Sequence, residues 1–188
     1  FFCLKFYLLE PLYSFGDDHF SFGRASDEEQ IDRLKGVSAV IAAAERYNQE
    51  VITSLPSLRV ISRFGVGFDS VDVRSATENN VVVTITPNSN YEAVAEHAIA
   101  LIMAVAKSIV ITTNEMRHGG WPTQPLLPVR GTSLGIVGLG RIGRSLAIRA
   151  RAMKMEVNAF EPKPDLEFVR EYDIGLMELD NILSVSDY

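Results

Sequence analysis

The sequence has few of the residues that mark disulfide-bonded, nucleic-acid-binding or membrane-spanning proteins. A single cysteine among 188 residues, Cys3, excludes a disulfide within the chain and agrees with a reducing compartment such as the cytoplasm. No Lys/Arg-rich run occurs, and the net charge of −6 disfavours nucleic acid or an anionic membrane surface as the main partner. The longest apolar run, residues 98–106, is too short to span a bilayer. We therefore expect neither a nucleic-acid partner nor a membrane partner, and the sequence predicts no metal site.

What the chain does contain is an alternation of strand-like and helix-like segments. With 47% hydrophobic residues it can bury a substantial core. Helix-like patterns cover residues 27–34 (with Ser26 as the cap), 48–54 and 71–79, and strand-like runs cover 1–9, 37–43, 58–62, 81–85, 134–137 and 155–160. This order predicts an α/β protein with right-handed βαβ units and mainly parallel sheet. We expect one unit over residues 1–88 and a second over residues 89–188.

The second unit is predicted to begin with one long helix over residues 91–116. The middle of this segment is apolar on nearly every side, so the helix should be buried all round, between two domains or in a subunit interface. His97 is interpreted as a buried, hydrogen-bonded packing residue of this helix. Residues 119–131 are rich in glycine and proline and predict a connection into the next strand.

The most informative motif is Gly-x-Gly-x-x-Gly, which ends an apolar run and precedes a helix-compatible pattern. In a strand–turn–helix setting this spacing predicts a dinucleotide site. Gly138 would permit the tight turn, Gly140 would let backbone approach a pyrophosphate, and Gly143 would let the helix pack closely on the sheet. The N–H groups at the helix start would hold the anion, which adds Arg141 and Ile142 to the cofactor-binding residues.

An acidic residue follows the next strand at the position expected for a ribose contact. Glu161 lies 18 residues after Gly143, where a carboxylate can accept hydrogen bonds from ribose hydroxyls and repel a 2′-phosphate. Lys163 would partly offset that repulsion, so the sequence favours NAD and leaves NADP as the alternative. The alternative is that Glu161 is a solvated turn residue before Pro162.

Three stretches together resemble the D-isomer-specific 2-hydroxyacid dehydrogenase family, which includes phosphoglycerate dehydrogenases and glyoxylate or hydroxypyruvate reductases. They are residues 62–72 (SRFGVGFDSVD), residues 86–97 (TPNSN followed by VAEH) and residues 135–143. The resemblance covers the chain from about residue 34 onward. It implies a flavodoxin-like substrate domain with a parallel sheet, a Rossmann NAD-binding domain that is incomplete here, and a homodimer formed through the helix at residues 91–116.

The resemblance also implies hydride transfer between the nicotinamide and C2 of a small D-2-hydroxy or 2-oxo acid. Backbone N–H groups of a glycine loop hold the substrate carboxylate in that family, which assigns Val66 and Gly67 to substrate binding. Arg63 stands where phosphoglycerate-type members place an arginine that can reach a distal phosphate. The alternative for the glycine loop is a plain strand-to-helix turn. The alternative for Arg63 is a surface arginine or one that forms a salt bridge. Asp69 and Asp72 are interpreted as structural residues that cap the next helix or bond local backbone.

The family's catalytic Arg, acid and His come after the third strand of the Rossmann half, and this sequence ends before them. We therefore expect no catalytic residue in these 188 residues, which as a fragment should be inactive. His19 and His118 lie at the wrong positions to substitute. The alternative function is a non-enzymatic, NAD(H)-sensing binding protein of the corepressor type on the same scaffold.

Overall fold

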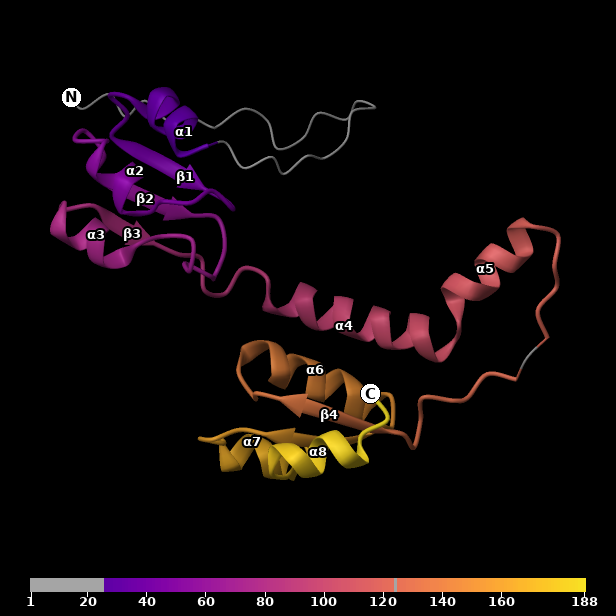
Figure 1. The fold of residues 1–188 in the computed structure, drawn as a ribbon. Coiled ribbons are helices and arrows are strands. Elements are labelled where there is room, and N and C mark those ends of the chain that lie inside the picture. The colour runs from indigo at the N-terminus through magenta and orange to yellow at the C-terminus, as the bar shows by residue number, and fades with distance from the viewer. Residues whose placement is uncertain (1–25, 124) are drawn as a thin grey trace. The chain divides into compact units, whose positions relative to one another are not determined.

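The computed structural model describes residues 26–123 and 125–188, which fall into two compact units, one ending at Asn90 and one beginning at Tyr91 (Figure 1). Each unit contains a three-stranded parallel sheet with helices in the connections, which confirms the α/β class. The strand predicted over residues 1–9, together with Cys3 and His19, lies outside the described residues.

The first unit has a parallel sheet with the strand order β1-β2-β3. Its strands are β1 (Ala39–Ala42), β2 (Val60–Arg63) and β3 (Val82–Thr84), and its helices are α1 (Asp27–Leu34), α2 (Gln49–Thr53) and α3 (Val73–Glu78). Every one of these elements starts and ends within two residues of its predicted bounds. The largest fully buried side chains of the core are those of Tyr47, Leu34, Ile52, Leu58, Ile61 and Val51.

Each helix of the first unit begins at a side chain that satisfies a free backbone donor. Ser26 accepts a hydrogen bond from the Glu29 N–H at 3.2 Å, which confirms it as the cap of α1. Asp72 accepts from the Ser75 N–H at 2.9 Å and caps α3. These caps fix where the helices start, and so where the preceding loops lie.

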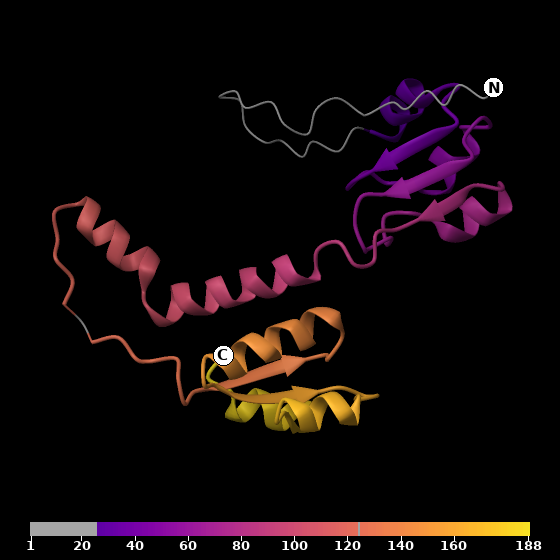
Figure 2. The ribbon, with the colours of Figure 1, turned by 180° about the vertical axis from the view of Figure 1, so that it is seen from behind.

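The second unit has a parallel sheet with the order β4-β5-β6. Its strands are β4 (Ser133–Val137), β5 (Glu156–Phe160) and β6 (Gly175–Leu176), and the helices around them are α6 (Arg141–Ala152), α7 (Leu166–Glu171) and α8 (Leu179–Val185). Figures 1 and 2 show β4 between α6 on one side and α8 on the other. No element is predicted from the sequence beyond residue 161, where the structure has α7, β6 and α8.

The chain crosses the sheet of the second unit after β6 and returns beside β4. The Gly135 N–H donates to the carbonyl of Tyr188 at 2.9 Å, and the Asp187 N–H donates to the carbonyl of Ser133 at 2.9 Å. These bonds use the edge of β4 that β5 leaves free. The strand order therefore reverses at β4, and in open α/β sheets ligands bind beyond the carboxyl ends of the strands at such a point.

The prediction of one continuous helix over residues 91–116 is wrong, because the structure has two helices there. Helices α4 (Tyr91–Ala106) and α5 (Ile109–Arg117) are bent by 58° at their junction. Ser108 has φ = 48°, a left-handed conformation that a right-handed helix cannot continue through. The residues that directly follow Ser108 are β-branched, and β-branched residues are weaker helix formers than the alanine and leucine residues of α4.

In the single chain this segment is largely exposed, so its expected burial between two domains or in a subunit interface stays a prediction. Ala95 is the one buried residue of α4, and none of α5 is buried, because within the described residues α4 packs mainly on α6. His97 is exposed and has no hydrogen-bond partner among the described residues, which corrects its interpretation as a buried packing residue. The exposed apolar side chains of the two helices include Leu101, Val105, Ile109, Val110, Ile111 and Met116.

Within residues 26–123 and 125–188, no single helix is long and apolar enough to cross a bilayer. Helices α4 and α5 taken together, despite the bend between them, would suffice by length and composition.

Candidate functional site

The glycine motif forms the turn between β4 and α6. Gly138 has φ = 100°, a backbone conformation that residues with a Cβ rarely adopt, and its N–H donates to the carbonyl of Phe160 at 2.8 Å. A Cβ at Gly143 would overlap the carbonyl oxygen of Gly138 and lie 3.3 Å from Cγ2 of Ile136. The first glycine therefore makes the turn, and the third allows α6 to pack directly on the turn and on β4.

The start of α6 presents backbone donors that have no acceptor within the described residues. The first N–H to bond into the helix is that of Arg144, which donates to the carbonyl of Gly140 at 2.9 Å. The N–H groups of Gly140, Arg141 and Ile142, which are exposed residues, therefore remain available, and the positive end of the helix dipole lies among them. This arrangement favours an anion.

Space for a ligand lies beside these donors. A Cβ built on Gly140 meets no atom within 4 Å, and no side chain caps the helix there. Arg141 and Ile142 are exposed, and Ile142 keeps 43% of its surface accessible. A diphosphate can therefore approach this backbone without displacing protein atoms.

Glu161 lies at the carboxyl end of β5, next to the glycine loop. Its Oε2 accepts a hydrogen bond from the Leu139 N–H at 2.9 Å, and its Oε1 accepts from the Lys163 N–H at 3.1 Å. The structure thus brings the predicted acid and the predicted loop together. Each carboxylate oxygen retains a lone pair that a ribose hydroxyl can use.

Sequence reasoning missed one residue that contacts the glycine loop through its side chain. Arg144 donates from Nε to the carbonyl of Leu139 at 2.9 Å and from Nη1 to Asp165 Oδ2 at 2.9 Å. Its place one residue after Gly143 was the available signal, but the spacing alone does not show which acceptors the side chain reaches.

Helix α6 is also held to α4 by a polar cluster. Arg149 donates to the carboxylates of Glu92 and Glu96, and the buried Ser145 hydroxyl donates to Glu92 Oε2 at 2.9 Å. The hydrogen bonds from Arg149 and then Ser145 hold the pKa of Glu92 below its ordinary value. The cluster fixes the rotation of α6 about its own axis, and hence where its first turn points.

The candidate substrate loop follows β2 in the first unit. The N–H groups of Val66 and Gly67 have no acceptor among the described residues, while the Thr86 N–H ties the loop to the end of β3 by donating to the Gly65 carbonyl at 2.9 Å. The structure therefore places two free amides at the carboxyl edge of the sheet. Exposed apolar side chains flank them, namely Phe64, Val66 and Phe68.

Arg63 supports this loop with its own side chain. Its Nε donates to the carbonyl of Gly67 at 3.0 Å, and its Nη1 donates to the carbonyl of Ala42 in β1 at 3.3 Å. Arg63 forms no ion pair within residues 26–123 and 125–188, and its Nη2 has no hydrogen bond there. The guanidinium therefore braces the loop and still has donors for a ligand.

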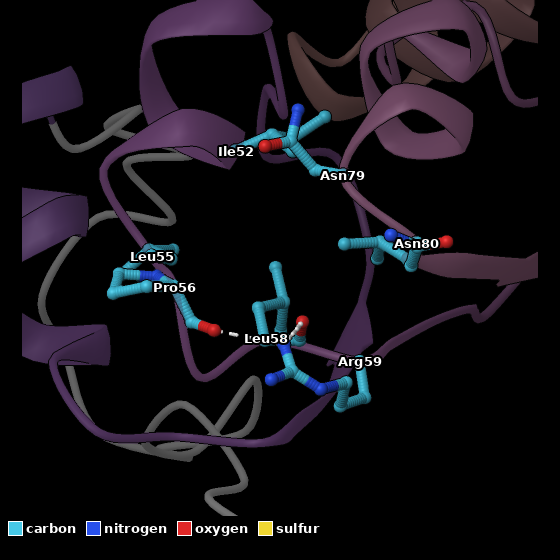
Figure 3. Close-up of a pocket in the computed structure, with 8 residues that line it drawn as sticks. Ile52, Leu55, Pro56, Leu58, Arg59, Asn79 and Asn80 are labelled. Atoms are coloured by element: carbon cyan, nitrogen blue, oxygen red, sulfur yellow. Dashed lines mark hydrogen bonds between the residues drawn. The ribbon is translucent and has the colours of Figure 1, made fainter.

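A cavity of about 410 Å³ in the first unit lies apart from all the predicted site residues (Figure 3). It is lined by Ile52, Leu55, Pro56, Leu58, Arg59, Asn79, Asn80 and Val81. Arg59 and Val81 precede β2 and β3, so the cavity lies at the opposite ends of these strands from the candidate substrate loop. Within it, Arg59 Nη1 donates to the carbonyls of Pro56 and Leu58 at 2.8 Å each (Figure 3).

Comparison with known proteins identifies relatives over most of the chain. The profile of the D-isomer specific 2-hydroxyacid dehydrogenase catalytic domain matches residues 10–178. The D-3-phosphoglycerate dehydrogenase of Archaeoglobus fulgidus is 33% identical over 165 residues, in an alignment that covers 86% of this chain and 31% of that protein. The glyoxylate reductase of Korarchaeum cryptofilum is 31% identical over 185 residues, covering 92% of this chain and 56% of that protein.

A solved structure shows the same fold. The crystal structure of the TT0316 protein from Thermus thermophilus aligns with a TM-score of 0.79 and 32% identity, covering 87% of this chain and 53% of that one. The chain thus spans between 31% and 56% of the length of these proteins.

Proposed function

Because the chain belongs to the D-isomer specific 2-hydroxyacid dehydrogenase family, we propose that it forms the nucleotide-binding and substrate-carboxylate-binding parts of an NAD-dependent oxidoreductase. The reaction is hydride transfer between the nicotinamide and C2 of a small D-2-hydroxy or 2-oxo acid, with a proton moving to or from the oxygen on C2. The observation that carries this proposal is the set of free N–H groups at the start of α6, directly beside Glu161.

In this proposal the diphosphate of NAD lies against the backbone of the glycine loop. The N–H groups of Gly140, Arg141 and Ile142 donate to its oxygens, and the open space at Gly140 accommodates it. Gly138 and Gly143 hold the turn in the required shape. Glu161 accepts hydrogen bonds from the ribose hydroxyls, and its charge disfavours the 2′-phosphate of NADP. NAD is therefore the proposed cofactor, which supplies or takes up the hydride when bound.

The substrate carboxylate lies against the first unit in this proposal. The free N–H groups of Val66 and Gly67 donate to the carboxylate, and Arg63 keeps their loop in place through its bond to the Gly67 carbonyl. The remaining donors of Arg63 suit a distal phosphate. The proposed substrates are therefore acids of the phosphoglycerate, hydroxypyruvate or glyoxylate class.

We also propose that these 188 residues bind NAD(H) without turning substrate over by themselves. The Arg, acid and His that act on the reacting carbonyl in the family have no counterpart in this sequence. The proposal includes a cytoplasmic location, which a single cysteine in 188 residues supports.

A homodimer through α4 and α5 is part of the same proposal. Val105 and Val110 keep 72% and 66% of their surfaces accessible in the single chain, and they belong to an apolar surface that extends over both helices. Exposed apolar surface of this extent favours association. A second copy of the chain would cover it.

The test of the proposed cofactor site is a fluorescence titration of the chain with NADH. We expect saturable binding that added NAD and ADP displace, because all three share the adenosine diphosphate. Failure of NADH to bind the folded chain would refute the proposal.

A non-enzymatic NAD(H)-sensing protein of the corepressor type is the competing function. Turnover of hydroxypyruvate, glyoxylate or 3-phosphoglycerate by the complete gene product would decide for the enzyme. Tight NADH binding by that product without turnover of any of the three would decide for the sensor.

A further inference from the structure

Side chains hold the two peptide groups of the glycine loop that meet at Leu139. The N–H of Leu139 donates to Glu161 Oε2 at 2.9 Å, and the carbonyl of Leu139 accepts from Arg144 Nε at 2.9 Å. The Leu139 side chain is 2% exposed and packs in the core of the second unit. This residue stands between the two glycines that form the diphosphate cradle, so its orientation determines where the neighbouring N–H groups point.

The other end of Arg144 is fixed to the start of α7. Its Nη1 donates to Asp165 Oδ2 at 2.9 Å, and its guanidinium carbon lies 5.1 Å from the ring centre of Phe168. Asp165 in turn caps α7, since its Oδ1 accepts from the N–H groups of Glu167 and Phe168 at 3.1 and 3.3 Å. Arg144 therefore joins the glycine loop to the residues that follow Glu161.

We propose that Arg144 is a positioning residue for the adenosine diphosphate half of the cofactor, a role that rests on the proposed function of the loop. It sets the separation between the two surfaces that this half contacts, the N–H groups of the loop and the turn at residues 161–165. Holding that separation before the ligand arrives lowers the entropy cost of binding.

The bond from Arg144 is needed because Glu161 both holds the loop and, in the proposed complex, binds the ribose. Glu161 bonds to the Leu139 N–H in the free chain, and in the proposed complex it also accepts hydrogen bonds from the ribose. Without Arg144, the Leu139 carbonyl would lose its side-chain donor, and the backbone of Leu139 would keep only the bond to Glu161. Arginine suits the position because its planar guanidinium donates in two fixed directions at once, whereas a lysine ammonium cannot hold the same two acceptors in that geometry.

The same helix offers a matched control. Arg151 also makes one bond to a carbonyl, from Nη1 to Met155 at 3.1 Å, and one to a carboxylate, from Nη2 to Asp173 at 2.6 Å. Its side chain is 32% exposed, close to the 38% of Arg144. Arg151 belongs to the last turn of α6, whereas Arg144 belongs to the first. Arg151→Met therefore removes the same kinds of contact without touching the glycine loop.

The experiment measures dissociation constants for NADH and for ADP in the wild-type chain, Arg144→Met, Arg144→Lys and Arg151→Met. We expect Arg144→Met to weaken both ligands about tenfold and by the same factor, because the variant loses the hydrogen bonds to Leu139 and Asp165 that support the site without contacting the ligand. Arg144→Lys should recover only part of that loss. Arg151→Met should bind both ligands as the wild-type chain does.

A second variant guards against a folding defect in Arg144→Met. Asp165→Asn keeps the Oδ1 atom that caps α7 and removes the charge that Arg144 contacts, so it should weaken NADH and ADP in the same direction with an unchanged thermal unfolding midpoint.

Wild-type affinity in Arg144→Met and Asp165→Asn, or an equal loss in Arg151→Met, would overturn the role of Arg144 while the cofactor site stands. Failure of the wild-type chain itself to bind NADH would overturn the proposed function and this inference together.

Discussion

Glu161 accepts a 2.9 Å hydrogen bond from the backbone N–H of Leu139, a residue 22 positions earlier in the chain. The bond joins the end of β5 to the turn after β4. The carboxylate therefore has a fixed place relative to the free N–H groups of the glycine loop before any ligand binds. Two substitutions of Glu161 can therefore distinguish the effect of its charge from the effect of its hydrogen bond to the loop.

We predict that Glu161→Ala narrows the preference for NAD over NADP. Removal of the carboxylate abolishes its repulsion of the 2′-phosphate, so the ratio of the NADPH to the NADH dissociation constant should fall about tenfold. Fluorescence titration with both cofactors measures this ratio. Glu161→Gln is the control for the loop contact, because its amide oxygen can still accept from the Leu139 N–H. The glutamine variant should show the same narrowing, and an unchanged ratio in both variants would contradict the assigned role of the charge.

Gly140→Val should abolish NADH binding and leave the fold in place. The added side chain enters open space, so it meets no protein atoms but occupies the path of the diphosphate. The cost to folding should be about 1 kcal/mol, the difference between glycine and a β-branched residue at a helix N-cap. Titration and urea unfolding test the two parts. NADH affinity equal to that of the wild-type chain would rule out this backbone as the diphosphate site.

Gly143→Ala should show a direct effect on stability. A Cβ there overlaps the Gly138 carbonyl oxygen, so α6 must move away from the turn. We expect a loss of about 1–3 kcal/mol in the free energy of unfolding, as for other overpacked sites. Urea denaturation monitored by circular dichroism measures it. Wild-type stability in this variant would mean that α6 does not pack on the turn as described.

The contact between α4 and α6 should depend on pH through Glu92. Its pKa is lower in the folded chain than its ordinary value of 4.5, chiefly because Arg149 donates to it. The unfolded chain therefore binds more protons at this group, and the stabilisation is complete above about pH 4.5 and is lost as the pH falls through the folded pKa. Urea midpoints at pH 7 and pH 3.5 should differ less in Glu92→Gln than in the wild-type chain.

Glu115 provides the control for this measurement, since its side chain has no ion pair within the described residues. Glu115→Gln should keep the wild-type pH dependence. If the urea midpoints at pH 7 and pH 3.5 differ by the same amount in Glu92→Gln and in the wild-type chain, the Arg149 contact does not contribute to the stability of the fold.

Val110→Asp should convert the proposed dimer into a monomer. The substitution places a charge in the apolar surface of α4 and α5, where burial without a partner is unfavourable. Light scattering after size-exclusion chromatography reports the mass. Leu183→Asp is the control, because Leu183 is 69% exposed on α8 and lies outside that surface. The proposed interface would be refuted if the wild-type chain is already monomeric at micromolar concentration, or if the Val110→Asp variant still forms a dimer.

The sequence by itself determined the local elements of the first unit. The cap at Ser26 and the β-branched run at residues 81–85 are short-range signals, and the structure follows both within two residues. The glycine spacing likewise specifies a turn that depends on the absence of Cβ atoms: Gly138 has a positive φ, and Gly143 packs directly on the Gly138 carbonyl. These features need no information about distant neighbours.

Only the tertiary structure decided the break at Ser108, the exposure of His97 and the contacts of Arg144. Residues 107–109 contain neither glycine nor proline, so the sequence does not reveal that Ser108 adopts a left-handed conformation. Burial depends on which elements pack on a helix, and within the described chain α4 packs mainly on α6. The acceptors of Arg144 come from Leu139 and Asp165, which are brought together by the packing of α6 and α7 around the sheet. Contacts of this kind depend on through-space distance, which residue patterns along a chain do not encode.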